Sequence, residues 1–198
     1  SFHFEYNPSY ANDLITDALE NAGAEKIHDT WYHDGKQIEI SFFIRSDDPI
    51  RKSIGEILSY ELENIGFKVK KDFGDLNKAF VVVYGSNPAM QKWHLYTEGW
   101  GSSGFSKYDS VGLAQMYSPW FSNMPGNNDP TYWNYKNDYI DTLTQKIYIG
   151  DFTSAQERTS LIEEATKEGV NESVRIFLAS KTDQFIANEN VDGVINAL

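Results

Sequence analysis

Two acidic side chains are the residues of this sequence best suited to do chemistry without a cofactor. Glu98 closes an apolar segment, and Asp109 follows in a stretch rich in aromatic residues. Two carboxyl groups on either side of a glycosidic bond are the arrangement that glycoside hydrolases use. Because the chain carries 29 Asp and Glu residues, such a pair also arises by chance. A carbohydrate-active enzyme that uses Glu98 and an aspartate is therefore the alternative hypothesis.

The sequence lacks the residue patterns that other kinds of catalytic site require. The chain has no cysteine, and its four histidines, at positions 3, 28, 33 and 94, form no HExxH pair. Gly101-Ser102-Ser103-Gly104 lacks the Lys-Ser/Thr ending of a phosphate-binding loop and does not fit the GxSxG pattern of a serine hydrolase. We expect no metal site and no cofactor.

Aromatic side chains give the sharper signal. Between residues 101 and 137, glycines and prolines alternate with aromatic residues, which predicts a long ordered region with little regular structure. Trp and Tyr offer flat, rigid contact area that stacks on sugars or covers peptide side chains. Some of these rings fill the core of the region, and we expect several of the following to line a ligand surface: Trp100, Tyr108, Trp120, Tyr132 and Trp133.

The first half of the chain must hold these residues in an α/β framework. Asn7-Pro8 predicts a helix start, and Asp34-Gly35 predicts the tight turn of a hairpin. Asp48-Pro49 predicts a second helix, followed by a strand at 67–70, so strand, helix and strand form a parallel crossover. The core face of that helix is expected to consist of Ile50, Ile54, Ile57, Leu58, Leu62 and Ile65.

The second half alternates helices with short apolar segments. Residues 76–84, after Asp75, fit a helix or a strand, and residues 93–97 predict a buried strand. Helices are expected from Asp138 to about Ile149, and from Asp151 or Thr153 to Gly169 with Gln156 in the capping-box position. Residues 174–178 predict a further core strand.

Composition narrows the class of protein. The 198 residues carry 17 Lys and Arg against 29 Asp and Glu, a formal charge of -12. This balance argues against nucleic-acid binding, which needs concentrated positive charge. The apolar runs are far shorter than the roughly 20 residues of a membrane helix. Since the sequence opens Ser1-Phe2-His3-Phe4 without a signal-like segment, we expect a piece of a longer polypeptide.

The order of motifs resembles extracellular solute-binding proteins of family 5, the oligopeptide and dipeptide receptors of ABC importers. Tyr6-Asn7-Pro8 with Ala11, Leu14 and Ile15 is similar to their YDPxxAxxLL segment, and Gly99-Trp100 to the GW at the lip of their cleft. Residues 93–100 look most like archaeal members. The other matching segments are 34–36, 51–69, 133–141, 174–178 and 191–194.

The resemblance implies a class II periplasmic-binding-protein-like lobe with a mixed central sheet flanked by helices. It implies that residues 1–198 form a single lobe, the second of a two-lobed receptor. The implied partners are the first lobe of the same polypeptide, ABC permease subunits and a small solute, and the implied location is extracellular, with an anchor outside this chain. No enzymatic activity is implied.

The resemblance also implies which residues bind the ligand, and this chain departs from the family pattern at two positions. It places Glu98, Trp100 and Ser103 at the ligand cleft, with Trp120 and Trp133 as aromatic walls. Oligopeptide receptors hold the two ends of a peptide with an arginine before GW and an aspartate after it, where this chain has Thr97 and Ser103. A neutral pair cannot anchor charged peptide ends. The ligand is therefore left open between an oligopeptide and an oligosaccharide.

Overall fold

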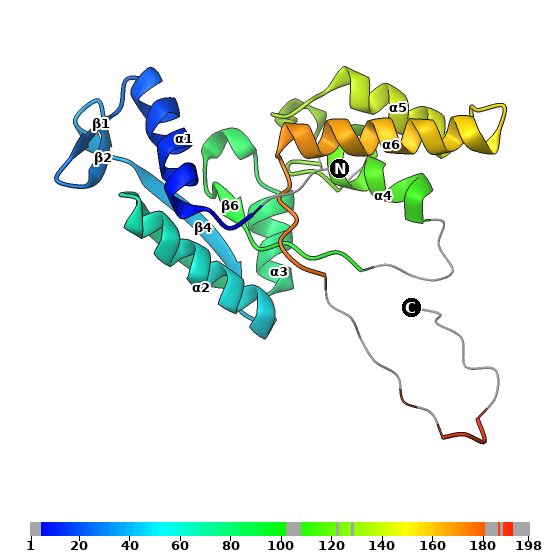
Figure 1. The fold of residues 1–198 in the computed structure, drawn as a ribbon, viewed down its shortest axis with the longest axis horizontal. Helices are drawn as coiled ribbons and strands as arrows, with labels where there is room; N and C mark the ends of the chain where they lie inside the picture. Colours follow the sequence, from blue (N-terminus) through cyan, green and yellow to red (C-terminus); the bar gives the residue numbers. More distant parts are fainter. Residues whose placement is uncertain are drawn as a thin grey trace. The chain divides into compact units, whose positions relative to one another are not determined.

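The structure is a computed structural model that describes residues 5–101, 108–121, 123–127, 129–180, 186 and 188–191, with only the backbone described at 108–110. The chain divides into two compact units. The first contains residues 1–82 and 91–99, and the second contains residues 83–90 and 100–198. Figure 1 shows the described elements along the chain.

The first unit is built on a small parallel sheet. Helix α1 (Pro8–Asn21) leads to an antiparallel sheet of β1 (Glu25–Ile27), β2 (Thr30–His33) and β3 (Lys36–Gln37). A second sheet has the order β5-β4-β6, from β4 (Glu39–Arg45), β5 (Lys68–Gly74) and β6 (Leu95–Tyr96). Both β5 and β6 pair with β4 in parallel. The expected sheet was mixed, whereas the described strands of this one are all parallel.

Helix α2 (Pro49–Asn64) is the crossover between β4 and β5. It lies close to the sheet at Gly55, where a Cβ atom would come within 2.6 Å of the Ile44 side chain. Buried side chains of Phe42, Phe43 and Ile44 form the centre of β4. The expected helix face was wrong at Ile50 and Ile57, which are 51% and 61% exposed, because the helix packs through its small residues instead.

The local start and turn signals are confirmed in this unit. The Asn7 side chain caps α1 by accepting from the N–H of Tyr10, and Asp48 caps α2 by accepting from the N–H groups of Ile50 and Arg51. Asp34 and Gly35 adopt positive φ angles between β2 and β3, as the hairpin turn requires. The segment after Asp75 is helical, with α3 (Leu76–Ala79) continuing into a π-helix η1 (Phe80–Tyr84).

The strand β5 is hydrogen-bonded to a strand on one side only among the described residues. Its side chains Lys68, Lys70 and Lys71 are exposed. Two of them form ion pairs with neighbouring elements, Lys68 with Glu39 and Lys71 with Glu63. Charge therefore lines the open edge of the sheet.

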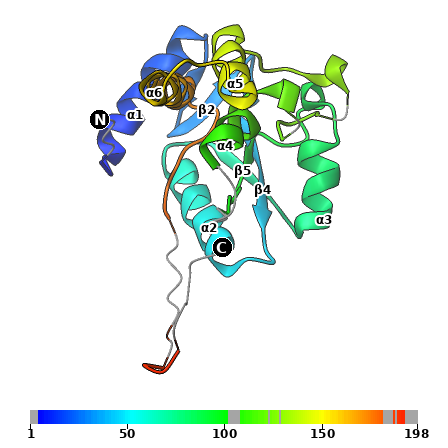
Figure 2. The ribbon, with the colours of Figure 1, turned by 90° about the vertical axis from the view of Figure 1, so that its right-hand side faces the viewer.

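The second unit is helical. It contains η2 (Pro88–Met90), α4 (Tyr108–Tyr117), η3 (Pro119–Phe121), η4 (Pro130–Tyr132), α5 (Asp138–Ile149) and α6 (Ala155–Glu172). Helices α4, α5 and α6 pack against one another (Figure 2). Their core contains Met116, Tyr117, Ile140, Leu143, Ile147 and Ala165.

Three expectations for this unit were wrong. Residues 101–137 include the helix α4, which α5 and α6 cover, so its apolar residues are not confined to one face and periodicity could not find it. Helix α6 is capped by Ser154, whose hydroxyl accepts from the N–H of Glu157. The residue whose side chain bonds back to the start of the helix is Glu157 rather than Gln156, and its carboxylate accepts from the backbone N–H of Thr153. Residues 174–178 form no strand: the Arg175 side chain binds the carbonyls of Met116 and Asn123, and Ile176 is 73% exposed.

Candidate functional site

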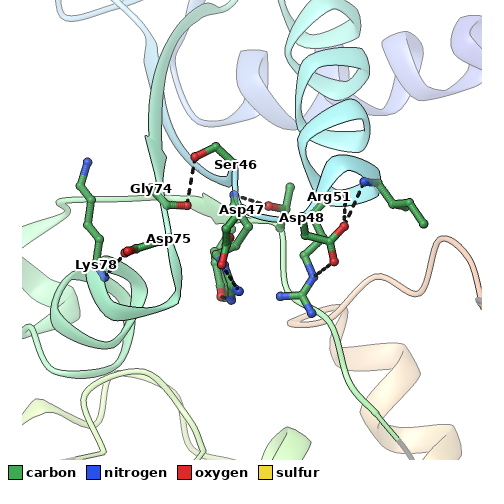
Figure 3. A network of polar contacts seen from close by, with 11 residues as sticks. Ser46, Asp47, Asp48, Arg51, Gly74, Asp75 and Lys78 are labelled. Atoms are coloured by element: carbon green, nitrogen blue, oxygen red, sulfur yellow. Dashed lines mark hydrogen bonds and ion pairs between the residues drawn. The ribbon is translucent and has the colours of Figure 1, made fainter.

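The carboxyl ends of the three parallel strands meet at one edge of the sheet. In open α/β sheets, ligands bind outside this edge. Here β4 ends at Arg45, β5 at Gly74 and β6 at Tyr96. Polar residues follow each strand, and Figure 3 shows the network that they form. We call the following set the polar edge: Arg45, Asp47, Asp48, Arg51, Tyr96, Thr97, Glu98 and Gly99.

Arg45 and Asp47 form the most buried ion pair of the polar edge. Nε and Nη2 of Arg45 donate to the two carboxylate oxygens of Asp47 at 2.7 and 2.8 Å, and Nη1 donates to the Tyr96 hydroxyl at 3.2 Å. This bidentate contact lowers the pKa of Asp47 to about 2 and raises the pKa of Arg45. The guanidinium thus ties the end of β4 to β6 and has its charge compensated within the protein.

Thr97 also serves the framework. Its side chain is buried, its hydroxyl oxygen accepts from the backbone N–H of Arg45 at 2.9 Å, and its own N–H donates to the carbonyl of Phe43 at 3.2 Å. These bonds extend the pairing of β6 with β4 by one residue. The Thr97 side chain, two residues before Gly99, is therefore occupied inside the first unit.

Arg51 has a different environment from Arg45. It lies in the first turn of α2, with its side chain 24% exposed and Nε 3.3 Å from the Asp48 carboxylate. A Cβ atom at position 99 would come within 2.3 Å of Nη2 of Arg51 and 2.6 Å of Cζ. Glycine at position 99 therefore makes room for this guanidinium against the backbone.

The structure places four of the five predicted site residues. Glu98 is half-buried at the polar edge, and its N–H donates to the carbonyl of Tyr96 at 3.1 Å. Trp100 is half-buried in the second unit, where it packs against the core cluster of Met116, Tyr117 and Ile140. The guanidinium carbon of Arg175 lies 5.2 Å from its ring centre. Ser103 lies outside the described residues.

The two aromatic walls have unlike contacts. The indole Nε1 of Trp120 donates to the hydroxyl of Thr144 at 3.3 Å, and its ring meets Phe121 and Tyr148 edge to face. The indole Nε1 of Trp133 is buried and makes no hydrogen bond with any described residue, and the same holds for Nε1 of Trp100. Trp120 therefore has a packing role, whereas Trp100 and Trp133 each retain an unused donor.

The histidines and the second carboxylate give no further site. The backbone N–H of Ser41 donates to Nδ1 of His94 at 2.9 Å, so His94 is structural. Within the described ranges, no group of three or more His, Cys, Asp or Glu residues is placed to hold a metal ion. The side chain of Asp109 lies outside the described part, so the pair with Glu98 stays a prediction.

Sequence reasoning missed Arg45, Asp47 and Arg51 as members of this edge. The signal that could have found them is the segment 45–51 directly after a buried strand, where polar residues accumulate at a strand-to-helix turn. No described helix is both long and apolar enough to cross a membrane.

Comparison with known proteins supports the fold. No family model matches the chain. No curated protein matches it. Among solved structures, the chain matches periplasmic binding proteins of class II. One of them is NikZ from Campylobacter jejuni in complex with Ni(L-His), which has 22% identity and a TM-score of 0.58 over 83% of this chain. The class II α/β fold is thus confirmed.

Two further matches bind other solutes. The oligopeptide-binding protein AppA from Bacillus subtilis, solved with a nonapeptide, has 18% identity and a TM-score of 0.60 over 83% of this chain. MelB from Agrobacterium fabrum, solved with stachyose, has 15% identity and a TM-score of 0.60 over 83%. The chain spans only 30%, 29% and 24% of the lengths of NikZ, AppA and MelB.

Proposed function

We propose that this chain is the ligand-binding lobe of an extracellular receptor that delivers a solute to an ABC importer. The observation that carries the proposal is the fold match over 83% of the chain to binding proteins named for nickel, peptide and oligosaccharide ligands. Because the chain spans less than a third of each of these three proteins, it corresponds to one part of a larger receptor. Both compact units belong, in this proposal, to that single lobe.

The mechanism is binding without covalent chemistry. Two lobes close around the solute, because the solute contacts both lobes only in the closed state. The closed receptor then docks on permease subunits. An isolated lobe supplies part of the contacts, so residues 1–198 alone bind the solute weakly. The membrane attachment of the receptor lies outside this chain.

The ligand contacts are assigned residue by residue. Glu98 supplies a carboxylate at the polar edge, and Ser103 supplies a hydroxyl. Trp100 and Trp133 supply ring faces together with indole N–H donors, which are buried and have no acceptor among the described residues. Trp120, whose N–H is bound to Thr144, supplies a ring face as an aromatic wall but no free indole donor. Unsatisfied buried donors favour a ligand rich in acceptor oxygens.

The solute is an oligopeptide or an oligosaccharide. Thr97 is neutral and bound to Arg45, so it supplies no charge to a peptide end. Aromatic faces with neutral hydrogen-bonding groups suit sugars, whereas Glu98 suits the amino group of a peptide. The alternative, a carbohydrate-active enzyme that uses Glu98 and an aspartate, predicts turnover of the oligosaccharide rather than retention.

Native mass spectrometry of the full-length protein, purified gently from its own host, tests the proposal. We expect a retained solute, either a ladder that fragments as peptides or masses spaced by hexose units. The variant Trp133→Phe removes one indole donor and is expected to weaken retention, whereas Trp93→Phe, which lies in the first unit, is the matched control. Reducing sugar released by the wild type and abolished in Glu98→Gln would favour the enzyme instead.

A further inference from the structure

The two arginines of the polar edge differ in what they leave available. All three groups of the Arg45 guanidinium are occupied, by Asp47 and by the Tyr96 hydroxyl. Arg51 makes one ion pair, through Nε with Asp48 at 3.3 Å. Its Nη1 and Nη2 make no hydrogen bond with the described residues, so the outer fork of this guanidinium keeps its donors.

The position of Arg51 is fixed from two sides. Asp48 holds Nε, and the same carboxylate accepts from the N–H groups of Ile50 and Arg51, so its negative charge is shared by the helix start. Gly99 holds the other side, since its missing Cβ leaves the space in which the guanidinium lies. A planar fork held in this way loses little further side-chain entropy when it binds.

The surroundings leave Arg51 as the source of positive charge for an anion at this end of β6. Arg45 is neutralised by Asp47, and Thr97 is neutral and buried. Lys78 lies after β5, where it pairs with Asp72 and donates to the carbonyl of Phe73 at 3.1 Å. One planar guanidinium fork matches one carboxylate, so a ligand with a single carboxylate fits best.

We propose that Arg51 is a specificity-determining residue that binds one carboxylate group of the solute beside Gly99. This inference rests on the proposed function and deepens it: the solute carries a carboxylate, either the free carboxyl end of a peptide or the acid group of an acidic sugar. The planar guanidinium matches a carboxylate with two parallel hydrogen bonds. Arg51 thus supplies the positive charge that Thr97 lacks.

Matched probes test this assignment by isothermal titration of the full-length protein. The first pair is trialanine with a free carboxyl end and trialanine amide, and the second is sialyllactose, which carries one carboxylate, and the neutral lactose. The variant is Arg51→Gln. The control is Lys52→Gln, which removes the same charge from the next residue of α2, where Lys52 is paired only with Glu56 at 3.8 Å among the described residues.

We expect Arg51→Gln to weaken the binding of an acid probe roughly tenfold or more and to leave its neutral counterpart unchanged, because charge-assisted hydrogen bonds are lost. Lys52→Gln should leave both unchanged. Which acid probe responds distinguishes a peptide from an acidic sugar. Equal losses for acid and neutral probes, or no loss for either, would overturn the assignment of Arg51 alone. If the wild type binds none of the four probes, both the proposed function and this assignment are overturned.

Discussion

Replacement of Gly169 by alanine tests how tightly α6 packs in the second unit. An added Cβ atom would come within 2.5 Å of Cε2 and 2.6 Å of Cζ of Tyr117. The Tyr117 side chain is 2% exposed and belongs to the core cluster, so the ring cannot move outward. Overpacking of this kind costs about 1–3 kcal/mol. Alanine favours a helix over glycine by about 1 kcal/mol. The net expected loss in the free energy of unfolding is therefore about 0–2 kcal/mol.

Urea unfolding followed by far-ultraviolet circular dichroism measures this loss. In a Tyr117→Leu background the ring is absent, and Gly169→Ala should then be neutral or stabilise by up to about 1 kcal/mol. Gly101→Ala is the control, because nothing lies within 4 Å of its added Cβ atom. A Gly169→Ala protein more stable than the wild type would refute the packing described for α4 and α6.

Three further substitutions concern a buried hydroxyl, Thr97, and two carboxyl groups with shifted pKa values, Asp47 and Asp141. Thr97→Val should cost about 1–3 kcal/mol in urea unfolding, since the Arg45 N–H loses its acceptor, whereas Thr97→Ser should not. The ion pair with Arg45 lowers the pKa of Asp47 from its ordinary value of 3.8 to about 2. The charged carboxylate therefore stabilises the fold at pH values above 3.8, and this stabilisation is lost as the pH falls toward about 2. The difference in Tm between wild type and Asp47→Asn should therefore shrink from pH 5 to pH 2; a constant difference would contradict the ion pair. Burial raises the pKa of Asp141, so its charged form destabilises the fold at neutral pH, and this penalty fades as the pH falls through the raised pKa and is absent below 3.8. Asp141→Asn should accordingly raise Tm at pH 7 and not at pH 3, and an equal rise at both would contradict this reasoning.

Short sequence motifs correctly predicted those elements that depend on interactions between residues close together in the sequence. Asn7, Asp34-Gly35 and Asp48 act through their own backbone, so the starts of α1 and α2 and the β2–β3 turn could be predicted from a few residues. The helix α5 was predicted with its observed bounds, from the Asn137 cap region to Gly150. The parallel crossover β4–α2–β5 was predicted because a strand pattern, a helix pattern and a second strand pattern follow one another in the sequence.

Features that depend on distant contacts could not be predicted. Helix α4 is specified by burial under α5 and α6 rather than by its own pattern. Residues 174–178 have strand-like composition, but Arg175 is held through its side chain, and no described strand pairs with them. The hydrogen bond from Arg45 to the Tyr96 hydroxyl requires the ends of β4 and β6 to meet, which no spacing in the sequence reveals. The role of Gly99 depends in the same way on Arg51, far earlier in the chain.

The lysines along β5 bear on how copies of this protein behave toward one another. An open sheet edge exposes N–H and C=O groups that a second chain can pair with, and this is a common route to fibrillar aggregates. Strands that pair lie about 4.8 Å apart. Two β5 edges brought together would place Lys68, Lys70 and Lys71 of one copy beside those of the other, and their repulsion opposes the contact. Acetylation of these three side chains would remove that protection without altering a single core residue.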